Sequence, residues 1–204
     1  MTTSSGNSGD RNDPIVTRKE FFRRCGHGLM EFINELFGEK LDAIAAAFPQ
    51  RLRPPGALPD GEFERQCSRC GGCVRACPHF AIKQVTDPAA FDSGTPFIKP
   101  SDTFCRMCPE FPCIGACPTG ALRFTNTSSI HVIGIAHVTE RLCVRLRDIP
   151  CRACASNCPA RFDALSFPAT NGAPRVNKER CTGCGACEAA CPIRPTPAII
   201  VEPR

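Results

Sequence analysis

Several absences limit what this 204-residue chain can do. It has no Ser-His-Asp order, no phosphate-binding loop and no G-x-G-x-x-G motif, so no catalytic constellation is visible. No apolar run reaches about 20 residues, the length that a transmembrane helix needs. The basic residues are dispersed and form no patch interleaved with aromatic residues, which argues against a nucleic-acid partner. We therefore expect a non-catalytic protein without a transmembrane segment.

Cysteine, in contrast, is abundant: the chain has 17 cysteines, together with 20 prolines and 16 glycines. An odd number of cysteines in short clustered runs does not resemble a secreted disulfide framework. A chain this rich in turn residues buries too little apolar area to fold on that alone. We expect inorganic groups to complete its core and the apo protein to be largely unfolded.

Sixteen of the cysteines form four runs, each closed by a proline. The first run, CSRCGGCVRACP, and the fourth, CTGCGACEAACP, have the spacing C-x2-C-x2-C-x3-C-P. The second run, CRMCPEFPCIGACP, widens the middle gap to four residues, and the third, CVRLRDIPCRACASNCP, widens the first gap to seven. In bacterial-type ferredoxins such a run ligates a 4Fe–4S cluster with its first three cysteines, and the fourth reaches another cluster.

Each iron of a 4Fe–4S cluster takes one thiolate, so sixteen cysteines suffice for four clusters. The predicted ligands are Cys67, Cys70, Cys73, Cys77, Cys105, Cys108, Cys113, Cys117, Cys143, Cys151, Cys154, Cys158, Cys181, Cys184, Cys187 and Cys191. Zinc is the main inorganic alternative, but its sites usually combine two separated C-x2-C knuckles, or cysteine with histidine. A different ligation in the irregular third run stays open.

Residues outside the runs give weaker indications. We expect Cys25, the seventeenth cysteine, to be a free thiol, and His79 to be a surface residue and not a ligand. Residues 1–14 are rich in Ser, Gly, Asn and Asp, which predicts a disordered tail. Apolar residues at helical spacing predict an amphipathic helix over 29–48, within an N-terminal arm and Pro-rich linker spanning 15–60. This helix either covers the cluster domain or docks a larger partner.

A motif at residues 17–23, TRKEFFR, is similar to a twin-arginine export signal in which Lys19 replaces the second arginine after Arg18. A working signal needs an uncharged apolar stretch next, whereas Glu31, Glu35 and Glu39 follow. We therefore expect a cytoplasmic location. The alternative is the periplasm, if the degenerate motif is functional.

The stretch from Arg51 to Pro192 resembles the NapG/MauM family of ferredoxin-type proteins. The resemblance is carried by RLRPPGAL before the first run, CRMCPEFPCIGACPTGAL in the second, and IGIAHV before Cys143. The second run is also similar to the four-cluster electron-transfer subunits of molybdopterin oxidoreductases. The resemblance implies electron passage between a quinol-side membrane protein and a catalytic redox enzyme, and it leaves association with a membrane complex open.

The resemblance to four-cluster proteins also implies a pairing in which outer runs share clusters with each other and inner runs do likewise. The implied fold is α+β and loop-rich, with two interleaved bacterial-type ferredoxin modules. The outer module would comprise 61–100 and 175–204, and the inner module 101–174. The implied ligand sets are Cys67, Cys70, Cys73 and Cys191; Cys181, Cys184, Cys187 and Cys77; Cys105, Cys108, Cys113 and Cys158; and Cys143, Cys151, Cys154 and Cys117. The pairing of adjacent runs is the alternative.

Three functional hypotheses follow. The first is a non-catalytic electron-transfer subunit of a larger oxidoreductase complex, whose partners are a catalytic subunit and an electron donor or acceptor. The second is a freely diffusing polyferredoxin. The third is an assembly or maturation factor that uses its clusters to prepare a redox enzyme.

Overall fold

The computed structural model describes residues 50–124, 131–169 and 172–204, all of which belong to one compact unit, residues 50–204. The predicted tail at 1–14, the export-like motif, Cys25 and the predicted helix over 29–48 lie outside the described residues. Within the described ranges, no helix is long and apolar enough to cross a membrane.

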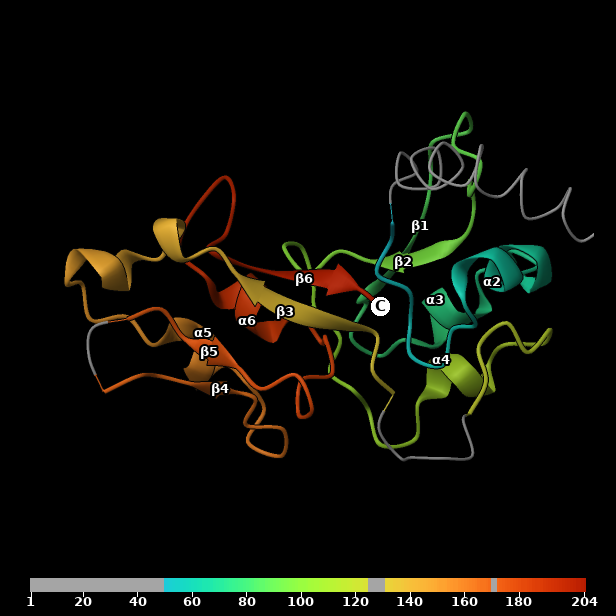
Figure 1. Cartoon of the computed structure of the whole chain (residues 1–204). Coiled ribbons are helices and arrows are strands. Elements are labelled where there is room, and N and C mark those ends of the chain that lie inside the picture. Colours follow the sequence, from blue (N-terminus) through green and yellow to red (C-terminus); the bar gives the residue numbers. More distant parts are fainter. Residues whose placement is uncertain (1–49, 125–130, 170–171) are drawn as a thin grey trace, which may run out of the picture. The chain divides into compact units, whose positions relative to one another are not determined.

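The helices of the described chain are short, and most lie inside a cysteine run (Figure 1). α2 (Asp60–Gln66) leads into the first run. One helix lies in each run, in chain order α3 (Gly72–Ala76), α4 (Pro112–Gly115), α5 (Ala153–Ser156) and α6 (Ala186–Ala190). Two 3-10 helices, η1 (Glu140–Leu142) and η2 (Val144–Arg147), flank Cys143. A proline follows the last cysteine of each run, and proline cannot continue a helix.

The strands form three two-stranded antiparallel sheets. The pairs are β1 (Ile82–Gln84) with β2 (Pro96–Ile98), β3 (Gly134–Val138) with β6 (Ile199–Pro203), and β4 (Leu165–Ser166) with β5 (Arg175–Val176). Figure 1 shows β3 and β6 side by side. In this pair, Gly134 lies opposite Pro203 and Val138 opposite Ile199. The sequence predicts strands at 81–85, 131–138 and 198–201, where β1, β3 and β6 lie. It also predicts one at 121–125, where Leu122 makes only an isolated bridge to Ala57.

Two hydrophobic cores surround the cysteines. The first contains Leu52, Phe63 and Ile98 together with cysteines of the first and second runs, and it also includes Cys184 of the fourth run. The second contains Leu165 and Ile199 together with cysteines of the third and fourth runs. In agreement, α3 packs against α4, and α5 packs against α6. The cores form around neighbouring runs because the short helices pack in pairs, run one with run two and run three with run four.

This arrangement corrects part of the predicted fold. The structure is α+β and loop-rich, as predicted. It does not have the predicted interleaving of an outer module, 61–100 with 175–204, around an inner module, 101–174, because the first run packs with the second and the third with the fourth. The structure therefore has a half built on runs one and two and a half built on runs three and four.

Candidate metal centres

The sixteen described cysteines surround four pockets, and each pocket is lined by four of them. The four pockets are similar in size, with about 340, 340, 350 and 380 Å³ of space, open in part to solvent. We number them along the molecule. Quartet I is Cys67, Cys70, Cys73 and Cys117; quartet II is Cys77, Cys105, Cys108 and Cys113; quartet III is Cys158, Cys181, Cys184 and Cys187; quartet IV is Cys143, Cys151, Cys154 and Cys191.

The quartets correct the pairing that the resemblance implied. The structure brings Cys117, and not Cys191, to the first three cysteines of run one. It brings Cys77 to run two, Cys158 to run four and Cys191 to run three. Each run thus exchanges its last cysteine with an adjacent run, which is the alternative that the sequence left open. The physical reason is the packing of α3 on α4 and of α5 on α6.

The local fold explains how one run serves two pockets. The third cysteine of each run lies on its short helix, and the fourth lies at or just beyond the helix end. In run one, Cys73 lies within α3 and faces quartet I, while Cys77 caps the same helix and faces quartet II. Residues four apart within a helix would share one face, but Cys77 has left the helix with an extended backbone (φ −75°, ψ 110°), and the two side chains line different pockets. The sequence predicts this division, and the structure has it in every run.

Backbone amides point at the sulfur atoms. The last cysteine of each run accepts a hydrogen bond from an amide further along the chain: Ala81 to Cys77, Leu122 to Cys117, Ala164 to Cys158 and Ala198 to Cys191, all at 3.3–3.4 Å. Two other ligand positions, Cys105 and Cys181, accept from Met107 at 3.4 Å and Ala136 at 3.5 Å. Amide donors stabilise negative charge on sulfur, so these sites suit thiolates bound to metal.

Burial shifts the pKa values of the inward-facing thiols upward. Desolvation raises the pKa of Cys73 to about 12 and that of Cys105 to about 12, with further contributions from neighbouring cysteines. At the exposed edge of quartet I, a hydrogen bond from the amide of Gly72 lowers the pKa of Cys70. Without metal, the buried thiols are therefore protonated at neutral pH, and metal binding must release those protons.

The donor sets suit a polynuclear group better than a single ion. Among the residues that the structure describes, no three His, Cys, Asp or Glu side chains are arranged to hold one metal ion. Instead, each pocket is lined by four thiols. Four thiols per pocket is the number that a 4Fe–4S cluster takes, one for each iron. His79 lies at the edge of quartet II as an exposed residue, as the sequence predicts.

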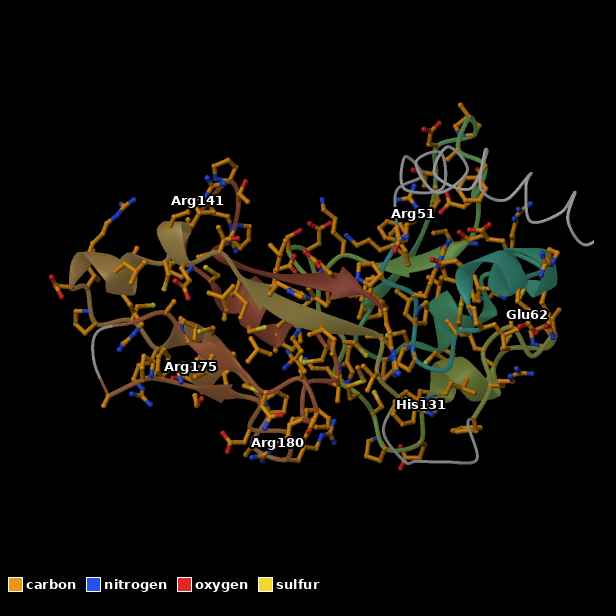
Figure 2. All side chains as sticks on the ribbon, in the orientation of Figure 1. Arg51, Glu62, His131, Arg141, Arg175 and Arg180 are labelled. Carbon is orange, nitrogen blue, oxygen red and sulfur yellow. The ribbon has the colours of Figure 1, made fainter. Side chains whose placement is uncertain are left out.

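Sequence reasoning missed a buried charge network next to quartet I. Asp92, which is fully buried, accepts hydrogen bonds from Arg51 at 2.6 Å and from Arg53 at 3.3 Å (Arg51 is labelled in Figure 2). Arg53 also donates to Thr95 at 2.8 Å and to the carbonyl of Pro96, which lines the quartet I pocket. The only signal in the sequence is the pair of arginines in RLRPP before the first run, and nothing in that stretch indicates their buried partner.

Known proteins are similar to this chain over the stretches that contain the cysteine runs. The family described as 4Fe-4S dicluster domain matches residues 66–121 and 149–194, so one match covers runs one and two and the other covers most of runs three and four. The ferredoxin-type protein MauM of Methylobacillus flagellatus, named for methylamine utilization, is 37% identical over 91% of this chain and 82% of its own length. A MauM of Paracoccus denitrificans is 38% identical over 75% of this chain and 71% of its own.

The ferredoxin-type protein NapG of Escherichia coli is 35% identical over 78% of this chain and 73% of its own length. No solved structure matches the chain. The two stretches matched by the dicluster family divide the cysteines as the quartets do, although the second match begins after Cys143. The structure adds Cys143 to quartet IV.

Proposed function

The chain belongs to the MauM and NapG family of ferredoxin-type proteins, and on that premise we propose that it transfers electrons through four 4Fe–4S clusters, one in each quartet. The observation that carries the proposal is the division of sixteen cysteines into four pockets of nearly equal size. When bound, a cluster of this kind takes up and releases an electron. The residues proposed to hold the clusters are those of quartets I to IV.

The chain's own groups have separate roles in this proposal. The thiolates fix each cluster, and the amides of Ala81, Leu122, Ala164 and Ala198 stabilise negative charge on the sulfur of the last ligand in each run. The hydrophobic cores limit the access of water, which would otherwise solvate the added negative charge of the reduced cluster and raise its reduction potential. No residue is assigned to bond making or bond breaking.

We place the exchange of electrons with partners at the two ends of the row of quartets. At quartet I, Cys70 and the preceding Ser68 and Arg69 are exposed. At quartet IV, the seven-residue gap of the third run carries Leu146 and Ile149, of which about half is exposed (49% and 50%). Exposed apolar side chains next to a redox site favour contact with another protein.

We propose that these partners are a catalytic oxidoreductase subunit and an electron donor or acceptor, within one larger complex. A freely diffusing polyferredoxin is the alternative, and it would keep activity with several unrelated reductases. A maturation factor that uses its clusters to prepare a redox enzyme is a further alternative. Deletion of its gene would then leave the mature partner enzyme fully active. We also propose a cytoplasmic location, with the periplasm as the alternative.

The test is elemental analysis of the full chain purified without oxygen. Four clusters require about sixteen iron atoms and about sixteen sulfide ions per chain. The Cys117→Ala variant, which lacks one ligand of quartet I, serves as the matched control and should hold about twelve of each. A content near eight in the unaltered chain, or zinc in place of iron, contradicts four clusters.

A further inference from the structure

A buried hydroxyl group lies in the wall of quartet III without a hydrogen-bond partner. Thr182 stands between Cys181 and Cys184 and lines their pocket. Only 3% of the residue is exposed. Across the described ranges, its Oγ1 is the one buried side-chain nitrogen or oxygen atom that lacks a partner. Folded proteins rarely leave such a group unpaired, because it loses its hydrogen bonds to water on burial.

The loop that carries Thr182 is held in place on its other side. The carbonyl oxygen of Thr182 accepts a hydrogen bond from the amide of Ile133 at 3.0 Å. Gly183, the next residue, has a φ of +71° and lies so close to the backbone of Gly134 that a β-carbon would overlap it. The loop therefore cannot turn the hydroxyl toward solvent without breaking these contacts.

The hydroxyl faces the sulfur atoms of the pocket. Burial raises the pKa of the Cys184 thiol, while the amide of Ala186 and the Thr182 hydroxyl both oppose this rise. Thr182 and Cys184 line the same pocket, and Thr182 Oγ1 makes no hydrogen bond to any described atom. Sulfur is the available acceptor on this side of the pocket, since quartet III supplies four cysteines there.

We propose that the Thr182 hydroxyl donates a hydrogen bond to sulfur of the 4Fe–4S cluster held by quartet III and thereby raises the reduction potential of that cluster. The inference rests on the proposed function, since it requires a cluster at this site. Reduction adds negative charge to the cluster, and a donor to sulfur stabilises the reduced form more than the oxidised form. Thr182 is therefore a residue that tunes the potential and holds no iron itself.

The other runs provide a matched comparison. The residue after the first cysteine is Ser68 in run one, Arg106 in run two and Val144 in run three. Ser68 also carries a hydroxyl that lowers the pKa of the neighbouring Cys70, but both residues are exposed. Water can replace the hydroxyl of Ser68, whereas it cannot easily replace that of Thr182. The effect we infer is therefore specific to quartet III.

The experiment is a redox titration of the full-length holoprotein, followed by electron paramagnetic resonance without oxygen. The variants are Thr182→Val and Thr182→Ala, which remove the hydroxyl, and Thr182→Ser, which keeps it. Ser68→Ala is the control at the exposed position. We expect one cluster signal to move to lower potential in Thr182→Val and Thr182→Ala, to stay near its original potential in Thr182→Ser, and to be unchanged in Ser68→Ala. A second readout is an exchangeable-proton coupling, measured after transfer to deuterated water, that is lost with the hydroxyl.

Two results overturn the inference. One is an unchanged set of potentials in Thr182→Val and Thr182→Ala, and the other is a Thr182→Ser protein that behaves like Thr182→Ala. Iron and sulfide are measured on the same samples. A chain without clusters contradicts the proposed function itself, whereas a chain with full clusters and unmoved potentials contradicts only the role of Thr182. If Thr182→Val binds less iron, the comparison of Thr182→Ala with Thr182→Ser decides the outcome.

Discussion

The backbone amide of Cys105 donates a hydrogen bond to the carbonyl oxygen of Cys184 at a distance of 2.9 Å. Cys105 belongs to quartet II and Cys184 to quartet III, so this bond joins the two halves of the described chain at their ligand loops. Quartets I and II are joined through α3 and α4, and quartets III and IV through α5 and α6. Each quartet is thus joined to the next by packed helices or by a backbone hydrogen bond, in the order I to IV.

The pairing of adjacent runs predicts which double variants lose one cluster and which lose two. Cys67 and Cys117 line the same pocket, whereas Cys191 lines a different one. The double variant Cys67→Ala with Cys117→Ala should therefore lose about four iron atoms, as each single variant does. Cys67→Ala with Cys191→Ala should lose about eight, because two clusters are then incomplete. Iron analysis of anaerobically purified protein measures both.

The outer-and-inner pairing makes the opposite prediction. In that arrangement Cys67 and Cys191 share a cluster, so their double variant loses about four iron atoms. Loss of about eight from the Cys67 and Cys117 double variant would contradict the grouping in this structure. Circular dichroism of each variant checks that the remaining clusters still hold the fold.

The sequence predicted that each run serves two pockets but predicted the grouping of the runs wrongly, for a physical reason. That the sixteen thiols are cluster ligands stays a prediction. The spacing within a run determines which cysteines lie on the loop, which lies on the helix and which lies at its end, as Cys73 and Cys77 illustrate. The local geometry of one run is the same whichever other run supplies its fourth ligand. The grouping depends on packing between α3 and α4 and between α5 and α6, and no pattern within a run records that packing.

The contact between Arg53 and Asp92 also could not be predicted from the sequence. The two residues are 39 positions apart, and Asp92 lies in an insert between the first two runs with no motif around it. Its complete burial comes only from the fold. In contrast, strand β1 and the short helices were predictable because apolar residues, glycines and the terminal proline of each run act locally.

We expect Asp92→Asn to destabilise the holoprotein by about 3 kcal/mol, because it leaves two arginines without their shared buried carboxylate. Arg53 is itself buried, and its guanidinium contacts the carbonyl of Pro96 in the wall of quartet I. Cluster loss from quartet I should therefore be faster than from the other quartets. Denaturant unfolding under anaerobic conditions gives the stability, and iron release to a chelator gives the rate.

Lys83→Gln is the matched control for this prediction. Lys83 and Asp102 form an ion pair of 2.6 Å, the same length as the Arg51 and Asp92 contact, but both side chains are about 40% exposed. An exposed pair contributes less than about 1 kcal/mol. If Lys83→Gln and Asp92→Asn lose the same amount of stability, the burial of Asp92 does not explain the contribution of its network.

Phe80 has a strained backbone, and its exposed side chain gains no burial energy that would offset the strain. Its φ is +54°, a value that favours glycine, and 79% of the residue is exposed. Met107 and Phe111 also have positive φ values, but both are buried. The equivalent residue of run two is Gly120, with a φ of +69°. We expect Phe80→Gly to stabilise the protein by about 1 kcal/mol, measured as a higher denaturant midpoint.

Gly120→Ala is the reciprocal variant and should lower the free energy of unfolding by about 1 kcal/mol, measured as a lower denaturant midpoint, because alanine is strained at that φ. A loss of stability in Phe80→Gly would contradict the strain that we assign to this backbone position. The two variants together separate the effect of backbone strain from that of side-chain burial.

Gly183→Ala should prevent quartet III from binding its cluster. Gly183 has a φ of +71°, and an added methyl group would overlap the backbone of Gly134 at the start of β3. Because backbone cannot move aside as a flexible side chain does, the ligand loop between Cys181 and Cys184 must shift. We expect the loss of about four iron atoms per chain and a lower thermal midpoint. Gly61→Ala is the control, since Gly61 lies in helix α2 with no atom within 4 Å of the added methyl group, and alanine favours a helix. That variant should keep all its iron and be slightly more stable, and a Gly183→Ala protein with full iron content would show that the loop tolerates a side chain at this contact.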